Sequence, residues 1–302
     1  MTVARAPAIS LAGVVKEYPL RGGQTVRALD GIDLEIASGE FVALIGPSGC
    51  GKSTVLRLIA ALEVPTAGTV TVEGQDPAAL ARAHRLGVAF QDHALLPWLS
   101  AWDNVALPFH VAERKVDAAR VRALLDMVGM AGFERARPRQ LSGGMCQRVA
   151  IARALALQPD VLLLDEPFGA LDAVTRRRLN LELQRIWADH SPAAPSLRHV
   201  PLGPSGGPGG AAGRSITTLL VTHSVDEAVF LADRVVVLSS RPGTVRTITQ
   251  VPFPRPRGRE LLTSPAFHDL VDRLTLALDQ GQGPQPEAPP PAVDAPALSV
   301  RA

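Results

Sequence analysis

Four short, almost wholly apolar runs divide the chain and predict buried strands. They are Phe41–Ile45, Val161–Leu164, Thr218–Val221 and Arg234–Leu238. A strand without polar alternation is expected to be covered on both faces, as in a parallel sheet. The stretches between these runs have helical patterns, so the hydrophobic pattern predicts a three-layer α/β core.

Segments rich in Val, Ile and Leu fill residues 9–45, and the last of them is the first of these four runs. Turn residues separate the segments at Pro19, Gly22–Gly23, Gly31 and Gly39. Short apolar segments punctuated in this way predict several β-strands.

Two stretches have little apolar surface to bury. Residues 190–215 are dense in Pro, Gly and Ser, and the tail at 281–302 contains the run GQGPQPEAPPPAV. Such composition favours solvated chain over a packed core. We predict a flexible insert at 190–215 and a disordered tail at 281–302.

Composition and charge narrow the function classes. Of the 302 residues, 46% are hydrophobic and 20% are charged, which predicts a globular protein. Lys and Arg total 31 against 29 for Asp and Glu, an excess too small for the phosphate neutralisation that nucleic-acid binding needs. No apolar run approaches the roughly 18 residues of a membrane span.

The N-terminus and the cysteines favour a cytosolic location. The N-terminus has no apolar stretch of signal-peptide length. Cys50 and Cys146 are too few for a disulfide framework and lack metal-ligand spacing.

A glycine-rich loop follows the first buried run and precedes a helical segment. This order of strand, loop and helix suits a nucleoside triphosphate, because backbone N–H groups and a helix N-terminus both favour phosphate. Lys52 is expected to reach the β- and γ-phosphates, and the Ser53 hydroxyl to ligate Mg²⁺. The predicted phosphate-binding residues are Gly46, Pro47, Ser48, Gly49, Cys50, Gly51, Lys52, Ser53 and Thr54.

Two carboxylates end the second buried run. Asp165 is expected to hold the Mg²⁺ shell, and Glu166 to act on the attacking water as general base or positioning group. An Asp-Glu pair alone is weak evidence, since it also arises as a solvated pair that caps the following helix. Beside the glycine-rich loop it predicts hydrolysis.

A further segment indicates which family of nucleotide-binding proteins the chain resembles. Leu141-Ser142-Gly143-Gly144-Met145 resembles the Leu-Ser-Gly-Gly-Gln signature of ATP-binding cassette (ABC) transporter proteins, with Met145 departing at the fifth position. Ser142, Gly143 and Gly144 precede a helix, which makes a second phosphate site. The resemblance implies a head-to-tail dimer, in which each signature closes over the γ-phosphate held by the other copy.

The resemblance also assigns single residues, and it spans about residues 9–240. Tyr18 matches the aromatic residue that stacks on adenine, although a single Tyr in a strand is otherwise more often packing. Gln91 matches the glutamine that contacts Mg²⁺ and water, and Asp172 matches the loop that communicates across the dimer. His223 matches the histidine that contacts the γ-phosphate.

The family fold implied is a P-loop NTPase three-layer core with an N-terminal antiparallel β subdomain and a nested helical subdomain at about 92–157. The expected organisation is a nucleotide-binding domain at 1–240, a strand and helix extension at 241–280 and the tail at 281–302. ATP and Mg²⁺ are the implied ligands, with Ser53, Gln91 and Asp165 at the metal.

The implied partners are a second copy of the chain, two transmembrane permease subunits and an extracytoplasmic solute-binding protein, without nucleic acid. The chain is then peripheral, on the cytoplasmic face of the inner membrane. Leu96-Pro97-Trp98 is expected either to receive the permease or to pack in the core.

The sequences of these motifs are similar to those in ATP-binding proteins of importers for taurine, aliphatic sulfonates and nitrate. The similarity is greatest to the proteins of taurine importers. The alternatives are the ATPase of an exporter and a soluble ABC ATPase that acts on nucleic acid. The chain lacks the long coiled-coil insertion or second cassette usual in the latter, and Glu166 and His223 argue against a non-hydrolysing module.

Overall fold

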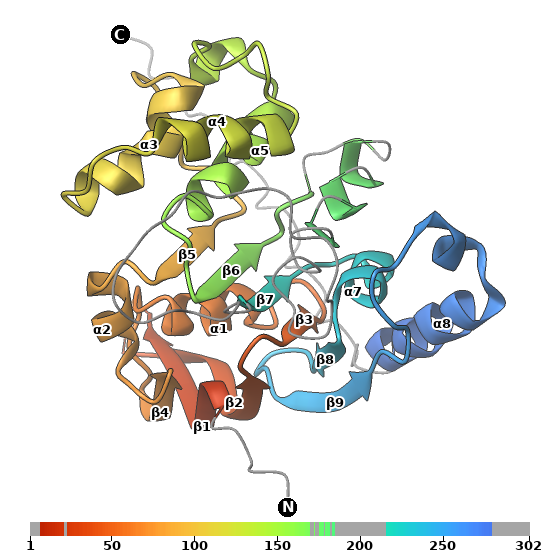
Figure 1. Ribbon diagram of the computed structural model, residues 1–302. Coiled ribbons are helices and arrows are strands. Elements are labelled where there is room, and N and C mark those ends of the chain that lie inside the picture. Colours follow the sequence, from red (N-terminus) through yellow and green to blue (C-terminus); the bar gives the residue numbers. More distant parts are fainter. Residues whose placement is uncertain are drawn as a thin grey trace, which may run out of the picture.

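The computed structural model describes residues 7–20, 23–169, 172, 175–177, 179–181, 183–184 and 216–279. Two β-sheets form its centre, and helices lie around them (Figure 1). The predicted flexible insert at 190–215 and the predicted tail at 281–302 lie outside the described residues.

The smaller sheet is antiparallel and comes from the N-terminal part of the chain. Its order is β2 (Thr25–Ala37), β1 (Pro7–Pro19) and β4 (Ala67–Val72). The predicted turn at Gly31 is wrong, because Gly31 lies inside β2 at a φ of 66°. Gly13 on β1 has a φ of 56°, and the pairing register of β1 and β2 shifts there. The two glycines therefore permit a bulge within long strands, where the sequence suggested a break between short ones.

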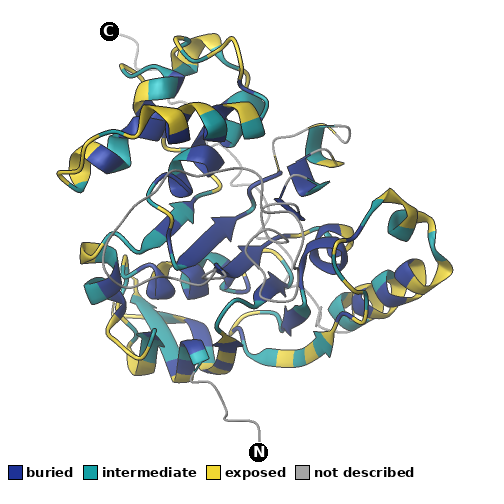
Figure 2. Ribbon diagram, in the orientation of Figure 1, coloured by how far each residue is buried: buried dark blue, intermediate teal, exposed yellow. Residues whose placement is uncertain are grey.

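The larger sheet contains all four predicted apolar runs. Its order is β5 (Leu86–Ala89), β6 (Val161–Asp165), β7 (Thr217–Val221), β3 (Phe41–Ile45), β8 (Arg234–Leu238) and β9 (Val245–Gln250). The first five strands are parallel, and β9 is antiparallel to β8. Every residue of β3, β6 and β7 is buried, as Figure 2 shows in dark blue. The prediction of strands covered on both faces is confirmed.

Side chains along these strands alternate between two hydrophobic cores. On β3, Phe41, Ala43 and Ile45 belong to one core, and Val42 and Leu44 belong to the other. The first core contains residues of α7 (Val225–Leu231) and α8 (Pro265–Asp279), and the second contains residues of α1 (Lys52–Ile59) and the smaller sheet. The sheet thus lies between two covering layers, which confirms the three-layer α/β prediction.

Three helices gather beyond one edge of the larger sheet, at the top of Figure 1. They are α3 (Ala101–Val111), α4 (Ala118–Met127) and α5 (Gly143–Ala154), and a 3₁₀ turn at Pro138–Gln140 precedes α5. A short helix, α2 (Pro77–Arg82), lies beside β4. In the part of the chain that the structure describes, no helix combines the length and the apolar character needed to cross a bilayer.

The segment after β8 is joined to the core by hydrogen bonds. The buried Arg257 donates to the carbonyls of Phe230 and Ala232, 3.1 and 2.7 Å away, at the end of α7. A 3₁₀ turn at Arg259–Thr263 then leads into α8, where Phe267 and Leu270 are buried. Helix α8 is therefore packed against the core, and β9 pairs with β8 at the edge of the larger sheet with alternate residues exposed.

Candidate functional site

Four of the five parallel strands bring candidate residues to one edge of the larger sheet. The glycine-rich loop follows β3, Asp165 ends β6, and His223 follows β7. Gln91 comes two residues after β5. The carboxyl ends of parallel strands meet at a common edge, where open α/β sheets bind their ligands.

The glycine-rich loop turns tightly against β2. Gly49 has a φ of 73°, and Gly51, which caps α1, has a φ of 100°. A Cβ atom on Gly51 would lie 2.5 Å from a methyl group of Leu29 and 3.1 Å from the carbonyl oxygen of Ala28. Glycine is therefore required at position 51 for both backbone conformation and space, and the loop delivers the N-terminus of α1 to the site.

The ammonium group of Lys52 lies inside the loop. Its Nζ donates hydrogen bonds to the carbonyl oxygens of Gly46 and Pro47, at 2.8 and 2.9 Å, and approaches the Cys50 sulfur at 4.0 Å. The thiol of Cys50 is buried, and burial raises its pKa. The loop thus surrounds a fixed positive charge at the point where a phosphate is expected.

The hydroxyl of Ser53 contacts the carboxylate that ends β6. Ser53 Oγ donates a hydrogen bond of 3.1 Å to Asp165 Oδ1. Burial raises the pKa of Asp165, and the hydrogen bond from Ser53 opposes that shift. A hydroxyl and a carboxylate are oxygen ligands of the kind that Mg²⁺ prefers, and a cation would offset the cost of the buried charge. The pair therefore fits Mg²⁺.

Few protein groups are available to this metal site. Among the residues that the structure describes, no cluster of three or more His, Cys, Asp or Glu side chains suits a metal ion. A cation held by Ser53 and Asp165 therefore needs further oxygen ligands from bound phosphate or water, which is the usual situation for Mg²⁺ in nucleotide sites.

Glu166 and His223 face each other across adjacent strand ends. Glu166 Oε2 lies 3.4 Å from His223 Nδ1, and the Glu166 backbone N–H donates to the carbonyl of Val221 at 2.8 Å. Glu166 has a φ of 45°, a left-handed conformation that costs energy in a residue other than glycine. The fold therefore holds the Glu166 backbone in a strained conformation that places its carboxylate beside His223.

A cavity of about 460 Å³ joins most of these groups. Among the predicted residues, Gln91, Glu166 and His223 line it, and Asp165 lies behind Ser53. The full lining is Tyr18, Val26, Ala28, Ser48, Gly49, Gly51, Lys52, Ser53, Thr54, Gln91, Glu166, His223 and Arg241. Sequence motifs far apart in the chain are thus assembled in one cavity.

Tyr18 is held at this cavity by its hydroxyl group. The hydroxyl donates to Glu63 Oε2 at 2.5 Å and lies 3.4 Å from Thr54 Oγ1. Burial is the main reason that the pKa of Tyr18 is raised. The Lys16 ammonium lies 5.1 Å from the centre of the Tyr18 ring. These contacts therefore hold the Tyr18 ring beside the loop, and its stacking on adenine stays a prediction.

The predicted signature residues lie elsewhere. Ser142 caps α5, where its hydroxyl accepts a hydrogen bond from the Met145 N–H at 3.3 Å, and Gly143 begins the helix. Neither these residues nor Gly144 line the cavity at the glycine-rich loop. Within one chain, the structure therefore does not bring the two predicted phosphate sites together.

Asp172 also lies outside that cavity. It is exposed, and its carboxylate accepts a hydrogen bond from the Thr175 N–H at 3.0 Å. Its carbonyl oxygen accepts from the Arg176 N–H, so Asp172 caps a helical turn.

Helix α5 is tied to the loop of Gln91. The buried Gln147 donates from Nε2 to the carbonyl of Phe90 at 3.1 Å. Arg153 donates to the carbonyls of His93 and Ala94, both at 2.9 Å. The helix that begins at the signature residues is therefore attached to both sides of Gln91.

Sequence reasoning did not single out several residues of the site. Gln147 lies only five residues after Ser142, but nothing in the local pattern indicates its partner. Glu63 binds Tyr18, and Arg241 lines the cavity from beyond β8. Neither belongs to a recognisable motif, so only the tertiary structure finds them.

The family model and the relatives that match this chain all belong to ABC transporters. Residues 29–169 match the family model described as ABC transporter. The nitrate import ATP-binding protein NrtD of Synechococcus elongatus is 42% identical over 88% of each chain. The aliphatic sulfonates import ATP-binding protein SsuB of Bacillus cereus is 36% identical, over 90% of this chain and 96% of its own length.

A third relative is longer than this chain. The bicarbonate transport ATP-binding protein CmpC of Synechococcus elongatus is 42% identical over 90% of this chain, which spans 38% of the length of CmpC. Among solved structures, the dimeric ATP-binding cassette MJ0796, in a post-hydrolysis state with ADP and Pi, gives a TM-score of 0.67 at 30% identity. That similarity covers 82% of this chain and 100% of MJ0796.

Proposed function

The chain belongs to the ABC transporter family of ATP-hydrolysing cassettes, and from that premise we propose that it energises the uptake of a small anion through separate permease subunits. One observation carries the chemistry. A single cavity is lined by residues of the glycine-rich loop and by the Glu166–His223 pair, and Ser53 in its wall donates a hydrogen bond to Asp165. These groups match the parts that phosphoryl transfer to water requires.

The chain's own residues divide the work on ATP. Backbone N–H groups of residues 49–53 and the N-terminus of α1 bind the phosphates, and Lys52 adds positive charge. Glu166 orients or deprotonates the attacking water, and His223 contacts the γ-phosphate. Tyr18 stacks on the adenine. Catalysis is then mostly positioning and stabilisation of charge.

Ser53 and Asp165 hold Mg²⁺ in this proposal, with Gln91 at its edge. When bound, the cation neutralises charge that develops on the phosphate oxygens.

A second copy of the chain completes the site. The residues Ser142, Gly143 and Gly144 do not line their own chain's cavity, so a partner subunit supplies them in a head-to-tail dimer. Asp172 is placed to communicate across the same interface. MJ0796, which is similar in fold, was solved as a dimer with ADP and Pi.

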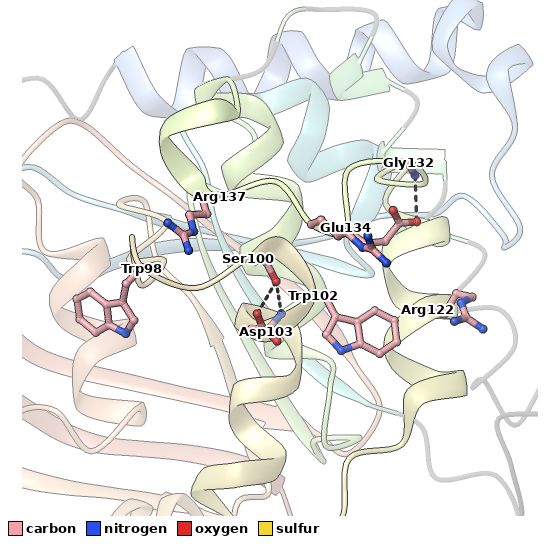
Figure 3. A pocket seen from close by; sticks show the side chains of 9 residues that line it. Trp98, Ser100, Trp102, Asp103, Arg122, Gly132, Glu134 and Arg137 are labelled. Atoms are coloured by element: carbon pink, nitrogen blue, oxygen red, sulfur yellow. Dashed lines mark hydrogen bonds between the residues drawn. The ribbon is translucent and has the colours of Figure 1, made fainter.

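The permease docks on the helical part of the chain. Trp98 is 65% exposed, which contradicts the alternative of core packing. It borders a cavity of about 670 Å³, shown in Figure 3, together with Ser100, Trp102, Asp103, Arg122, Gly132, Glu134, Arg135 and Arg137. An exposed tryptophan beside a cavity is an effective anchor for a partner. Docking there places the chain at the cytoplasmic face of the inner membrane, in a complex that also includes a solute-binding protein.

The solute is one of a few small anions. The motif wording favours taurine, an alkanesulfonate or nitrate, and similarity to CmpC adds bicarbonate. A cassette does not touch the solute, so this choice rests on kinship.

Uptake measurements test the proposal. Cells with the gene, without it, or with Lys52→Ala are given labelled taurine, an alkanesulfonate, nitrate and bicarbonate in separate assays. Selective loss of one solute in both mutants supports import and identifies the solute. Unchanged uptake of all four contradicts an importer of these anions.

A further inference from the structure

The loop between β8 and β9 is built directly against the glycine-rich loop. Gly243 donates from its N–H to the Ala28 carbonyl at 2.9 Å, and its carbonyl accepts from the Asp30 N–H at 3.0 Å. A Cβ atom on Gly243 would lie 2.1 Å from the Cys50 carbonyl oxygen. The backbone at 243 therefore contacts both β2 and the phosphate loop, with no space for a side chain.

Internal hydrogen bonds fix the shape of this loop. The Ser239 N–H donates to the Thr244 carbonyl at 3.0 Å, and the Thr244 N–H donates to Ser239 Oγ at 3.0 Å. The two hydroxyl groups lie 2.9 Å apart, and Ser239 Oγ also donates to the Pro242 carbonyl at 3.2 Å. The turn that carries Arg241 is thus held from both of its ends.

Arg241 extends from this turn to the mouth of the cavity. Its Nε donates to the Gly49 carbonyl at 3.3 Å, and a Cβ atom on Gly49 would lie 3.5 Å from Arg241 Nη2. Among the described residues, no carboxylate forms an ion pair with Arg241. The guanidinium is therefore a positive charge in the cavity that no acidic side chain of that part of the chain neutralises.

We propose that Arg241 is a phosphate-binding residue of the nucleotide site. Its planar guanidinium has paired N–H donors that match phosphate oxygens, whereas Lys52 already uses two of its donors on the loop carbonyls. Arg241 follows β8, so the fifth parallel strand contributes to the same edge as the other four. This inference rests on the proposed function, since it assumes that the cavity binds a nucleotide.

Calorimetric binding of a non-hydrolysable ATP analogue tests the proposal, using the full chain at concentrations where it is monomeric. Arg241→Ala is expected to raise the Kd by on the order of tenfold, since one charge-assisted contact is lost. Arg241→Lys, which keeps the charge, is expected to fall between the wild type and Arg241→Ala. Arg246→Ala, on the exposed face of β9, is the matched control and is expected to bind as the wild type does.

Further measurements separate the explanations. Arg241 is exposed, so the nucleotide-free Arg241→Ala variant is expected to melt at the same temperature as the wild type. Equal melting temperatures exclude a folding defect. A Kd for Arg241→Ala equal to that of the wild type overturns the proposal. This holds even if the variant no longer forms nucleotide-dependent dimers. Failure of the wild-type chain itself to bind the analogue overturns the proposed function as well.

Discussion

The hydroxyl of Ser53 and the carboxylate of Asp165 lie 3.1 Å apart, although 112 residues separate them in the chain. This contact joins the start of α1 to the end of β6. It also aligns the phosphate loop with Glu166, the next residue along the chain. The hydrogen bond therefore holds the N-terminus of α1 beside the end of β6, where Glu166 follows.

Because the charge of Asp165 is buried, we expect its removal to raise the stability of the protein and to lower its activity. Burial raises its pKa, so its protonated form stabilises the fold. That stabilisation is complete below the pKa of the unfolded chain and is lost as the pH rises through the folded pKa. At pH 7, Asp165→Asn is therefore expected to raise the melting temperature of the nucleotide-free protein, by about 2–4 °C for a gain of about 1 kcal/mol.

Thermal melts from pH 4 to 8 check this prediction. The advantage of Asp165→Asn should shrink as the pH falls, because Asp165 then becomes neutral in the wild type. The variant should also lose Mg²⁺-dependent ATP hydrolysis. The exposed Asp226→Asn is the control, and a melting temperature for Asp165→Asn at or below the wild-type value would contradict the argument.

Removing the charge of Glu166 should separate binding from hydrolysis. Glu166→Gln is expected to lower kcat by about 10²–10⁴-fold while ATP binding is retained, because a general base is lost and the phosphate loop is intact. In the presence of ATP, dimers of the Glu166→Gln variant should then accumulate, and size-exclusion chromatography detects them. Glu113→Gln, an exposed carboxylate on another surface, serves as the control. ATP hydrolysis by Glu166→Gln at the wild-type rate would contradict the proposed role of Glu166 as general base.

The contact between Gln147 and the Phe90 carbonyl predicts an effect on turnover. Gln147→Leu removes the amide group and its N–H donor, and it leaves the part-buried Phe90 carbonyl without this partner. Because Phe90 precedes Gln91, we expect kcat to fall several-fold with little change in the Kd for ATP. Steady-state ATPase assays and calorimetry measure the two quantities, with the exposed Gln75→Leu as control. An unchanged kcat would show that the contact does not position Gln91.

Glu227 is expected to contribute strongly to stability. Its carboxylate accepts from the Thr222 hydroxyl at 2.7 Å and lies 3.3 Å from Arg176 Nε. Glu227→Ala should lower the free energy of unfolding by about 2–4 kcal/mol, since a buried hydroxyl loses its acceptor and a partly solvated ion pair is broken. Glu227→Gln should cost less, because it can still accept from Thr222. Urea denaturation measures both, and a loss no larger than that of the neighbouring exposed Asp226→Ala would refute the argument.

The sequence by itself determined the buried strands and the position of the glycine-rich loop between a strand and a helix. Continuous apolar runs predicted β3, β6, β7 and β8, since each of these segments must be covered on both faces wherever it lies. The glycine-rich loop at 46–54 likewise requires little context, because its glycines and the helix after it are adjacent in the chain.

Only the tertiary structure decided how these parts meet. Gly31 suggested a turn, yet the pairing of β1 with β2 makes it a bulge inside a strand. Arg241 lines the cavity and Glu63 binds the Tyr18 hydroxyl, although neither belongs to a motif. Trp98 faces outward where its apolar character allowed burial. These outcomes depend on strand order, register and contacts between distant segments, which are set by packing of the whole chain and leave no trace in local residue patterns.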